Sequence, residues 1–397
     1  MKTGPISVLL VSNAVVRGGA EEHILQLLGG LDRKLFRLHL ACPPELARLY
    51  GSDVPSDVVV TTLNLDRLSD VSGAWKLARF IRRHKIDLMH SHMFRASLFA
   101  SPVGWLCRVP VIIDTSHGRE LWRKGWKANF FVDRCAARFV DHTIAVSAAT
   151  RRYLVEQKEL PAEKISVICS AVDVHRFSPD HPAPQGLKQS LGFDANDPVL
   201  VVAGRLEPQK GHRVLIDAMP AVLEEFPRAK LVCLSEGSLR PELERRIAQL
   251  NLQRSVFLVG QQRDVRDWLA MADINVLPSF YEGLPLAAIE ALAMAKPMVA
   301  TAVDGTPEVV RDGETGQLAP AGDPAKLAEA IRDMLRNPAR AQEMAQAGRR
   351  FVVENFSIET LVRRTQELYL DQWERYQRRT HGAHVAAKSQ AASATNK

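Results

Sequence analysis

The sequence predicts an α/β protein built from two consecutive domains, each with a parallel β-sheet covered by helices. Short apolar runs alternate with helix-like segments through both halves of the chain. A stretch rich in proline and glycine separates the two halves. The length of 397 residues suits two domains, and 46% hydrophobic with 24% charged residues is a soluble globular composition.

The first domain is predicted to cover residues 1–180. Its predicted strands are 6–11, 37–41, 58–63, 86–90, 111–115, 142–146 and 166–169, and its predicted helices are 20–30, 73–84, 95–106, 126–139 and 147–157.

A linker over residues 181–197 leads to a second domain at 198–356. Its predicted strands are 198–203, 230–234, 256–259, 274–277 and 297–301, with helices between them. Ser357 is a good N-cap for a long helix over 357–378. The residues 379–397 are rich in alanine, serine and glutamine and are predicted to form a disordered tail.

The positive charge is confined to the first half of the chain. Residues 1–180 hold 25 lysines and arginines against 18 acidic residues, whereas the remainder holds 27 of each. A basic half favours an anionic surface or partner, although ordinary solubility charge is an alternative. No basic run accompanies a recognised nucleic-acid-binding fold, so nucleic acid is not an expected partner.

Composition also bears on the compartment. No apolar run approaches the roughly 18–20 residues that span a bilayer, and Ile6–Val11 fits a first strand better than a signal peptide. Five scattered cysteines without a Cys-x-x-Cys pair fit free thiols in a reducing cytoplasm. We therefore expect a cytoplasmic protein.

The stretch 279–296 places two carboxylates around a predicted helix start. A buried strand delivers Glu282 to a loop, Gly283 allows a close turn, and Pro285 suits a first helical position before the helix that carries Glu290. A helix N-terminus attracts anions and carboxylates accept hydrogen bonds from hydroxyls, so the pattern suits a ligand with phosphates and hydroxyls. Two solvated surface glutamates are the alternative.

A loop near the start of the second domain supplies cations. Gly204 ends a strand, and Arg205 and Lys210 stand five residues apart before a helix, which suits a diphosphate. In the first domain, Gly18 and Gly19 follow the first strand, but they do not form the Gly-x-Gly-x-x-Gly pattern of NAD-binding folds.

One histidine also follows a strand in the first domain. His117 could bind a sugar hydroxyl or act as an acid or base, although His90 and His92 are similarly placed, so this signal is weak. The sequence has no Asp-x-Asp and no clustered histidine and cysteine set, so no metal is expected.

A short segment after His117 interleaves aromatic and basic residues. Such a mixture is typical of membrane-interface contacts, and a packed helix start with solvated cations is the alternative. The residues are Trp122, Arg123, Lys124, Trp126 and Lys127.

Together these motifs resemble those of the family-4 glycosyltransferases, retaining enzymes of GT-B fold. The Glu, seven residues, Glu signature matches at Glu282 and Glu290. Further matches are Gly-Arg-Leu with Lys-Gly at 204–211, Gly-x-Leu-Arg at 237–240, Gly-x-Pro-Glu at 305–308, Asp-Gly-x-Thr-Gly at 312–316 and Gly-Gly-Ala-Glu at 18–21. The chain departs from the family at Ser170-Ala171, where Asn-Gly is frequent, and at Ser235-Glu236, where Gly-Asp is frequent.

The resemblance implies a role for each matched residue. Arg205 and Lys210 would hold the diphosphate of a nucleotide-sugar, with Gly204 beside them. Glu290 would bind the ribose. The transferred sugar would be bound by Glu282 and by the N–H groups near Gly283 and Leu284, which precede Pro285. Gly19, with Gly18, would approach the diphosphate or acceptor, and His117 would contact the donor sugar.

The resemblance also implies the reaction class. It predicts a metal-independent, retaining hexosyltransferase without a cofactor, whose final helix crosses back onto the first domain. With the basic half, it predicts a saccharide or lipid-linked acceptor and a peripheral position on the cytoplasmic membrane face, in polysaccharide, lipopolysaccharide or glycolipid synthesis. A GT-B-like nucleotide-sugar 2-epimerase and an inactive nucleotide-sugar-binding protein are the alternatives.

Overall fold

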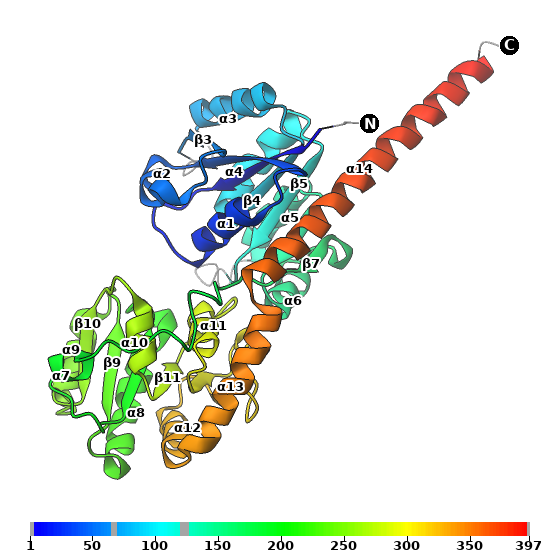
Figure 1. The fold of residues 1–397 in the computed structure, drawn as a ribbon. Coiled ribbons are helices and arrows are strands. Elements are labelled where there is room, and N and C mark those ends of the chain that lie inside the picture. The colour runs from blue at the N-terminus through cyan, green and yellow to red at the C-terminus, as the bar shows by residue number, and fades with distance from the viewer. Residues whose placement is uncertain (1–3, 65–69, 120–126, 395–397) are drawn as a thin grey trace. The chain divides into compact units, whose positions relative to one another are not determined.

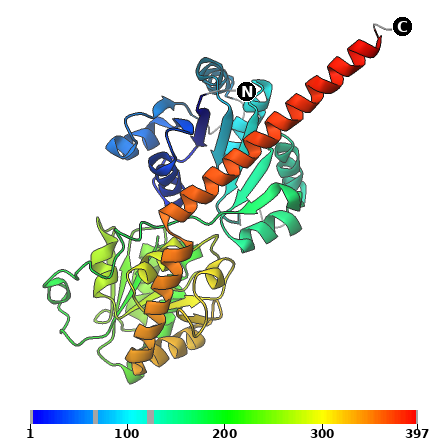
Figure 2. The same ribbon diagram turned by 45° about the vertical axis from the view of Figure 1, so that its right-hand side comes forward.

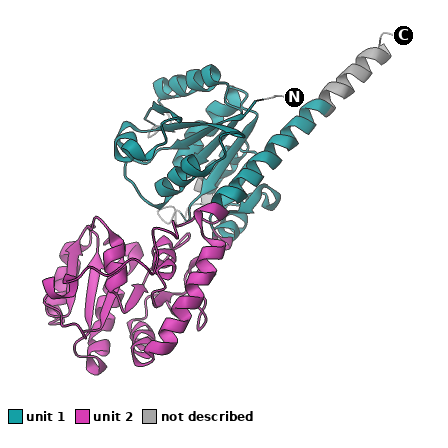
Figure 3. Cartoon of the chain, viewed as in Figure 1, with its two compact units in different colours: residues 1–146, 150–168, 361–397 teal, residues 147–149, 169–360 magenta. Residues whose placement is uncertain are grey.

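The computed structural model describes residues 4–64, 70–119 and 127–394 (Figure 1). The chain forms two compact units, coloured separately in Figure 3. The first holds residues 1–146, 150–168 and 361–397, and the second holds residues 147–149 and 169–360. The sequence places the boundary later, after residue 180, because the proline-rich stretch begins there, whereas the chain leaves the first sheet directly after its last strand.

The first unit is a parallel sheet of seven strands in the order β3-β2-β1-β4-β5-β6-β7. Every pairing between these strands is parallel, as the alternation of strands and helices predicts. The strands are β1 (Ile6–Ser12), β2 (Phe36–Cys42), β3 (Val59–Thr62), β4 (Leu88–His92), β5 (Val111–Ser116), β6 (His142–Ala145) and β7 (Ile165–Val167).

Helices connect these strands and cover the sheet. They are α1 (Gly19–Gly30), α2 (Pro44–Tyr50), α3 (Val71–His84), α4 (Phe94–Leu106), α5 (Lys127–Ala137) and α6 (Ala148–Glu156). All seven residues of β1 are buried, and Leu9 packs in one core with Leu77 of α3 and Phe99 of α4. Burial of such apolar side chains on the sheet is the main force that holds the unit together.

The long C-terminal helix α14 (Ile358–Ala394) belongs to the first unit from Leu361 onward. Tyr369 is fully buried, its ring lies 5.8 Å from that of Phe36, and its hydroxyl lies 2.6 Å from His90 Nδ1. Gly30 permits this packing, because a Cβ there would lie 2.4 Å from Val362 Cγ2. Figures 1 and 2 both show this helix alongside the first sheet.

The end of α14 differs from the sequence-based expectation. The sequence predicts a helix to about residue 378 and a disordered tail over 379–397, but the helix continues to Ala394. The alanine-rich composition of this segment explains the difference, because alanine has the highest helix propensity of the amino acids.

The second unit is a parallel sheet of six strands in the order β10-β9-β8-β11-β12-β13. Its strands are β8 (Val199–Ala203), β9 (Lys230–Leu234), β10 (Val256–Gly260), β11 (Ile274–Leu277), β12 (Met298–Thr301) and β13 (Gln317–Ala319). Its helices are α7 (Leu187–Ser190), α8 (His212–Glu225), α9 (Arg240–Gln249), α10 (Val265–Met271), α11 (Leu286–Ala293), α12 (Pro324–Arg336) and α13 (Pro338–Asn355). The predicted architecture of two parallel-sheet α/β units is confirmed.

Candidate active site

Two loops of the second unit open side by side at the carboxyl edge of its sheet. β8 leads into residues 204–211, and β11 leads into residues 278–285. The two strands pair directly, with Asn275 opposite Val201. Parallel α/β sheets bind ligands at this edge, so the two loops define a candidate site.

An ion pair between Lys210 and Glu282 joins the two loops. Lys210 Nζ donates to Glu282 Oε1 over 2.6 Å, and Ser279 Oγ donates to the same oxygen over 2.7 Å. The Glu282 side chain is 6% exposed and that of Lys210 is 19% exposed. Both charges are therefore held in one geometry in surroundings with little water, where electrostatic interactions are strong.

Glycines allow the Lys210 loop to approach β11. Gly211 has a φ of +66°, and a Cβ there would lie 1.9 Å from the carbonyl oxygen of Pro278, so no other residue fits without movement. A Cβ on Gly204 would lie 3.4 Å from Lys210 Cδ, so the stem of Lys210 packs against the backbone of Gly204. Gln209 completes the contact, because its carbonyl accepts from Phe280 N over 2.8 Å.

The segment between the two signature glutamates offers free backbone donors. Within the described part of the chain, the N–H groups of Gly283 and Leu284 have no hydrogen-bond acceptor. α11 begins at Leu286, one residue later than the sequence predicts, and Pro285 takes the cap position. Glu290 lies in the middle of α11 and is half-buried. The donors of Gly283 and Leu284 thus lie next in the chain to the Glu282 carboxylate.

Arg205 differs from Lys210 in having its side chain exposed. Among the described residues, its guanidinium has no hydrogen-bond or ion-pair partner. It lies in the loop of Lys210, so a diphosphate at this edge could contact one cation held by an ion pair and one that is exposed to solvent.

The predicted glycine pair lies at the start of α1 in the first unit. Gly18 is the residue before the helix, and Gly19 is its first residue. A Cβ on Gly18 would lie 3.2 Å from Glu21 Oε2, so glycine leaves room for that carboxylate beside the helix start. Burial raises the pKa of Glu21.

Four histidines form a cluster in the first unit, where the sequence predicts a role for His117 alone. His117 Nε2 lies 3.3 Å from His92 Nδ1, and the ring of His23 lies 5.2 Å from that of His117 and 5.3 Å from that of His92. The ring of His90 lies 4.2 Å from that of His92, and its Nε2 lies 2.6 Å from Thr115 Oγ1.

Burial keeps this cluster uncharged at neutral pH. It lowers the pKa of His117 to about 4 and that of His90 to about 3, and it lowers the pKa of His23 and His92 well below the usual value. A neutral imidazole can donate or accept a hydrogen bond with a sugar hydroxyl. It is a poor proton donor at pH 7, so the lowered pKa argues against the predicted acid role of His117.

The predicted membrane or acceptor segment can be followed only in part. Trp122, Arg123, Lys124 and Trp126 lie outside the described residues, and Lys127 is the first residue of α5. In the described ranges, no three histidine, cysteine, aspartate or glutamate side chains are placed to hold a metal ion. No helix in those same ranges is long and apolar enough to span a bilayer.

Sequence reasoning missed two residues of these sites. Ser279 begins the signature stretch but has no predicted role, although a hydroxyl three residues before a buried carboxylate is a recognisable signal. His23 lies in α1 and meets His117 only through the fold, and no local pattern marks it.

Two family models match successive parts of the chain. Residues 17–176 match the model of Glycosyltransferase Family 4, and residues 185–351 match that of Glycosyl transferases group 1. The chain is 30% identical to the alpha-maltose-1-phosphate synthase of Mycolicibacterium smegmatis, over 89% of this chain and 95% of that protein. It is 26% identical to the UDP-Gal:alpha-D-GlcNAc-diphosphoundecaprenol alpha-1,3-galactosyltransferase of Escherichia coli, over 89% of this chain and 94% of that protein.

The fold is likewise shared with solved structures. The Anabaena protein Alr3699/HepE in complex with UDP superposes with a TM-score of 0.82 at 22% identity, over 92% of this chain and 100% of that one. The same protein in complex with UDP-glucose superposes with a TM-score of 0.81 at 22% identity, over 92% of this chain and 100% of that one.

Proposed function

Because this chain belongs to glycosyltransferase family 4, we propose that it transfers a sugar from a nucleotide-diphosphate sugar to an acceptor with retention of configuration. The observation that carries this proposal is the Lys210–Glu282 pair at the carboxyl edge of the second sheet. The fixed cation of this pair would suit a diphosphate, and the buried carboxylate beside it would suit sugar hydroxyls. The Anabaena neighbour, which was solved with UDP-glucose, supports the choice of donor class.

The donor would be held by the second unit. Lys210 and Arg205 contact the diphosphate, and Glu290 accepts hydrogen bonds from the ribose hydroxyls. Glu282 Oε1 already receives two hydrogen bonds, so its other oxygen remains for a hydroxyl of the transferred sugar. The N–H groups of Gly283 and Leu284 add two donors to the same sugar.

In the proposed reaction, the bond between the sugar C1 and the diphosphate breaks and a bond from C1 to the acceptor oxygen forms on the same face. The proton of the acceptor hydroxyl passes to an oxygen of the leaving phosphate. Lys210 and Arg205 stabilise the negative charge that develops on the diphosphate, which is the part of the reaction that positioned cations accelerate most. No metal ion or cofactor takes part in this scheme.

A panel of nucleotide-sugars tests the proposal. The donor that raises the melting temperature most is identified first, because a ligand that binds the folded state stabilises it. It is then incubated with saccharide and polyprenyl-diphosphate-linked acceptors. Transfer of label to an acceptor, with the anomeric configuration retained, supports the proposal. Isomerised free donor would identify the 2-epimerase alternative, and binding without turnover would identify an inactive binding protein.

For the acceptor, we propose a lipid-linked saccharide at the cytoplasmic face of a membrane. The Escherichia coli relative is named for a diphosphoundecaprenol acceptor, which supports this class. The structure adds a described surface on the first unit. α3 packs against α4, and α4 packs against α5. The three helices carry large exposed apolar side chains: Trp75 is 61%, Trp105 56%, Leu106 68% and Phe131 61% exposed.

The charge of this α3–α5 surface complements an anionic membrane. The Arg79 guanidinium lies 5.5 Å from the Trp75 ring. Residues 71–108 contain one acidic residue, Asp87, which is buried. The same range contains seven exposed cations: Lys76, Arg79, Arg82, Arg83, Lys85, Arg95 and Arg108. Exposed tryptophans among cations are typical of proteins that lie at the membrane interface, where each cation near anionic lipid contributes about 1 kcal/mol.

Vesicle binding tests the membrane part separately from catalysis. We expect the protein to bind vesicles that contain phosphatidylglycerol, and to bind less as salt screens the charges. Trp75→Ala/Trp105→Ala should weaken this binding, whereas Phe280→Ala, which removes an exposed aromatic residue from the second unit, should not. Equal binding by both variants, or none to anionic vesicles, would refute the membrane role and leave the donor chemistry unaffected.

A further inference from the structure

A cavity of about 460 Å³ lies at the amino edge of the second sheet, opposite the candidate active site. Residues before β8, β11 and β12 line it, together with the end of α12 and the start of α13. Asp273 lies just before β11, and Ser279 lies just after it. Four strand residues at roughly 3.3 Å each separate the two edges by about 13 Å. The cavity is therefore distinct from the site of Lys210 and Glu282.

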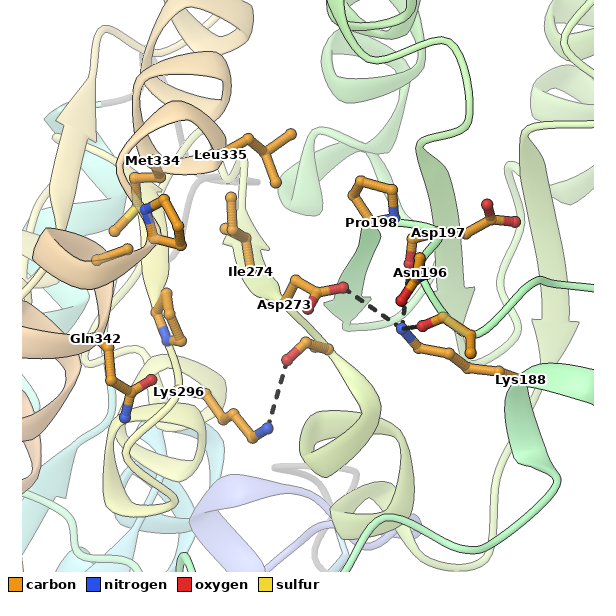
Figure 4. Close-up of a pocket in the computed structure, with 15 residues that line it drawn as sticks. Lys188, Asn196, Asp197, Pro198, Asp273, Ile274, Lys296, Met334, Leu335 and Gln342 are labelled. Atoms are coloured by element: carbon orange, nitrogen blue, oxygen red, sulfur yellow. Dashed lines mark hydrogen bonds and ion pairs between the residues drawn. The ribbon is translucent and has the colours of Figure 1, made fainter.

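Two lysines line the cavity, and Figure 4 shows Lys188 and Lys296 reaching into it from different sides. Lys188 Nζ donates to the carbonyl oxygens of Ala195 over 3.2 Å and Asp197 over 3.1 Å. Lys296 Nζ donates to the carbonyl oxygens of Ala270 and Ala272. An ammonium has three donors, so these bonds leave one N–H on each lysine.

The cations are only partly neutralised by their surroundings. Asp273 Oδ2 lies 3.7 Å from Lys188 Nζ, but it already accepts from Val199 N over 2.7 Å. Lys296 has no carboxylate within ion-pair distance among the described residues. Burial lowers the pKa of Lys296, which reflects the cost of holding an ammonium away from water. The carbonyls at the end of α10 offset part of that cost.

Part of the cavity wall is apolar. Ile274 is 1%, Met334 is 2% and Ala341 is 3% exposed, and all three line the cavity. Figure 4 shows Ile274, Met334 and Leu335 across the cavity from Lys188. A volume of this size falls in the range of small-molecule pockets, which combine apolar walls with a few placed polar groups.

We propose that this cavity is a second ligand site and that it binds a small organic anion. A phosphate or carboxylate group takes the remaining N–H donors of Lys188 and Lys296, and a compact body packs against Ile274 and Met334. Lys188 is paired with Asp273, whereas Lys296 has no ion-pair partner among the described residues. An anion there would pair with the Lys296 ammonium, which is the reason for choosing this ligand class over a neutral one. The proposal is independent of the proposed transferase function.

The test must first remove anion binding at the other edge of the sheet. The background variant Arg205→Ala/Lys210→Ala/Glu282→Gln lacks both active-site cations and carries no unpaired Glu282 carboxylate. Its melting temperature is followed during titration with inorganic phosphate, glucose 6-phosphate and succinate, in a buffer free of phosphate and carboxylate. We expect a saturable rise with at least one probe. Comparison of glucose 6-phosphate with succinate shows which anionic group the site takes.

Variants then place the binding in the cavity. Lys188→Gln removes one charged donor and should weaken binding of the responding probe at least about tenfold. Lys230→Gln is the matched control, because Lys230 Nζ also donates to a backbone carbonyl, that of Arg254, but does not line the cavity. Asn196 is exposed and lines the cavity, so Asn196→Trp should block the site while both lysines stay in place.

The outcomes are distinct. Binding that persists in the background variant, survives Lys230→Gln and is lost in Lys188→Gln and Asn196→Trp supports the second site. The absence of a saturable response to all three probes overturns it. Equal affinity of Asn196→Trp and Lys230→Gln for the responding probe also overturns it. Because Asn196→Trp keeps both lysines, this result does not depend on how well Lys188→Gln folds.

Discussion

Lys210→Ala is expected to lower the turnover number by about 10²–10³-fold. Removal of one preorganised donor to a developing negative charge typically costs about 2.7–4 kcal/mol, and each 1.36 kcal/mol is a factor of ten in rate. Lys210 fits that case, because Glu282 holds its Nζ at 2.6 Å and Gly204 packs against its stem. Little reorganisation is then needed when the diphosphate leaves, so the upper part of the range is expected.

The same change has a structural cost that can be separated from the catalytic one. In Lys210→Ala, the Glu282 carboxylate keeps only Ser279 as a described side-chain donor, with 6% of its side chain exposed. Breaking a buried ion pair from one side costs about 3–5 kcal/mol, and the partial exposure of Lys210 places this pair near about 3 kcal/mol. Lys210→Ala/Glu282→Gln removes the stranded charge and should recover most of that stability without recovering turnover.

Two measurements on four proteins test this reasoning. Initial rates at saturating donor give the turnover number. Urea unfolding gives the free energy of unfolding for wild type, both variants and Lys230→Ala, a control on a half-buried lysine outside the candidate site. Turnover within threefold of wild type in Lys210→Ala would refute the assigned charge stabilisation. Turnover that returns with stability in the double variant would show that Lys210 only holds the loop together.

Three further results are expected. Gly211→Ala should lower the free energy of unfolding by clearly more than Gly313→Ala. Both glycines have positive φ, but only at Gly211 would a Cβ meet a carbonyl oxygen, at 1.9 Å. Urea unfolding should therefore show a loss of about 1 kcal/mol for Gly313→Ala and a larger loss for Gly211→Ala. Ser235→Gly should raise the free energy of unfolding by about 1 kcal/mol, because Ser235 holds a φ of +95° that glycine adopts without strain, and an unchanged urea midpoint would contradict this. Stability should fall as the pH drops from about 6.5 to about 4, because the unfolded chain protonates His117 there while the folded chain keeps it neutral. His117→Gln should then reduce the slope by about 1.4 kcal/mol per pH unit, and exposed His175→Gln should leave it unchanged.

The sequence predicts most of the fold because strands buried on both faces appear as continuous apolar runs. β1 is such a run and was predicted over Ile6–Val11, one residue short of its observed end. α2 was missed because Pro43 and Pro44 indicate a turn, although proline is tolerated at the first position of a helix. β13 was missed because it is only three residues long and begins with a glutamine.

The candidate site was predictable in its residue types and not in its contacts. Lys210 and Glu282 follow the ends of two predicted strands, which marks both as candidates. Their direct contact joins positions 72 residues apart, and it depends on the pairing of β8 with β11, which no local pattern encodes. The histidine cluster was hidden for the same reason, because His23, His92 and His117 come from three separate elements and meet only after the sheet forms.

The geometry of Glu282 also decides between two roles for the signature carboxylates. Oε1 accepts from a lysine and from a serine hydroxyl, so two donors already occupy that oxygen. Glu290 lies eight residues further along the chain, on α11. An acid and base pair would need two carboxyl groups in contrasting environments, one of them protonated. A carboxylate fixed by a cation instead suits hydroxyl binding, which agrees with the proposed reaction, in which the leaving phosphate would take the acceptor proton.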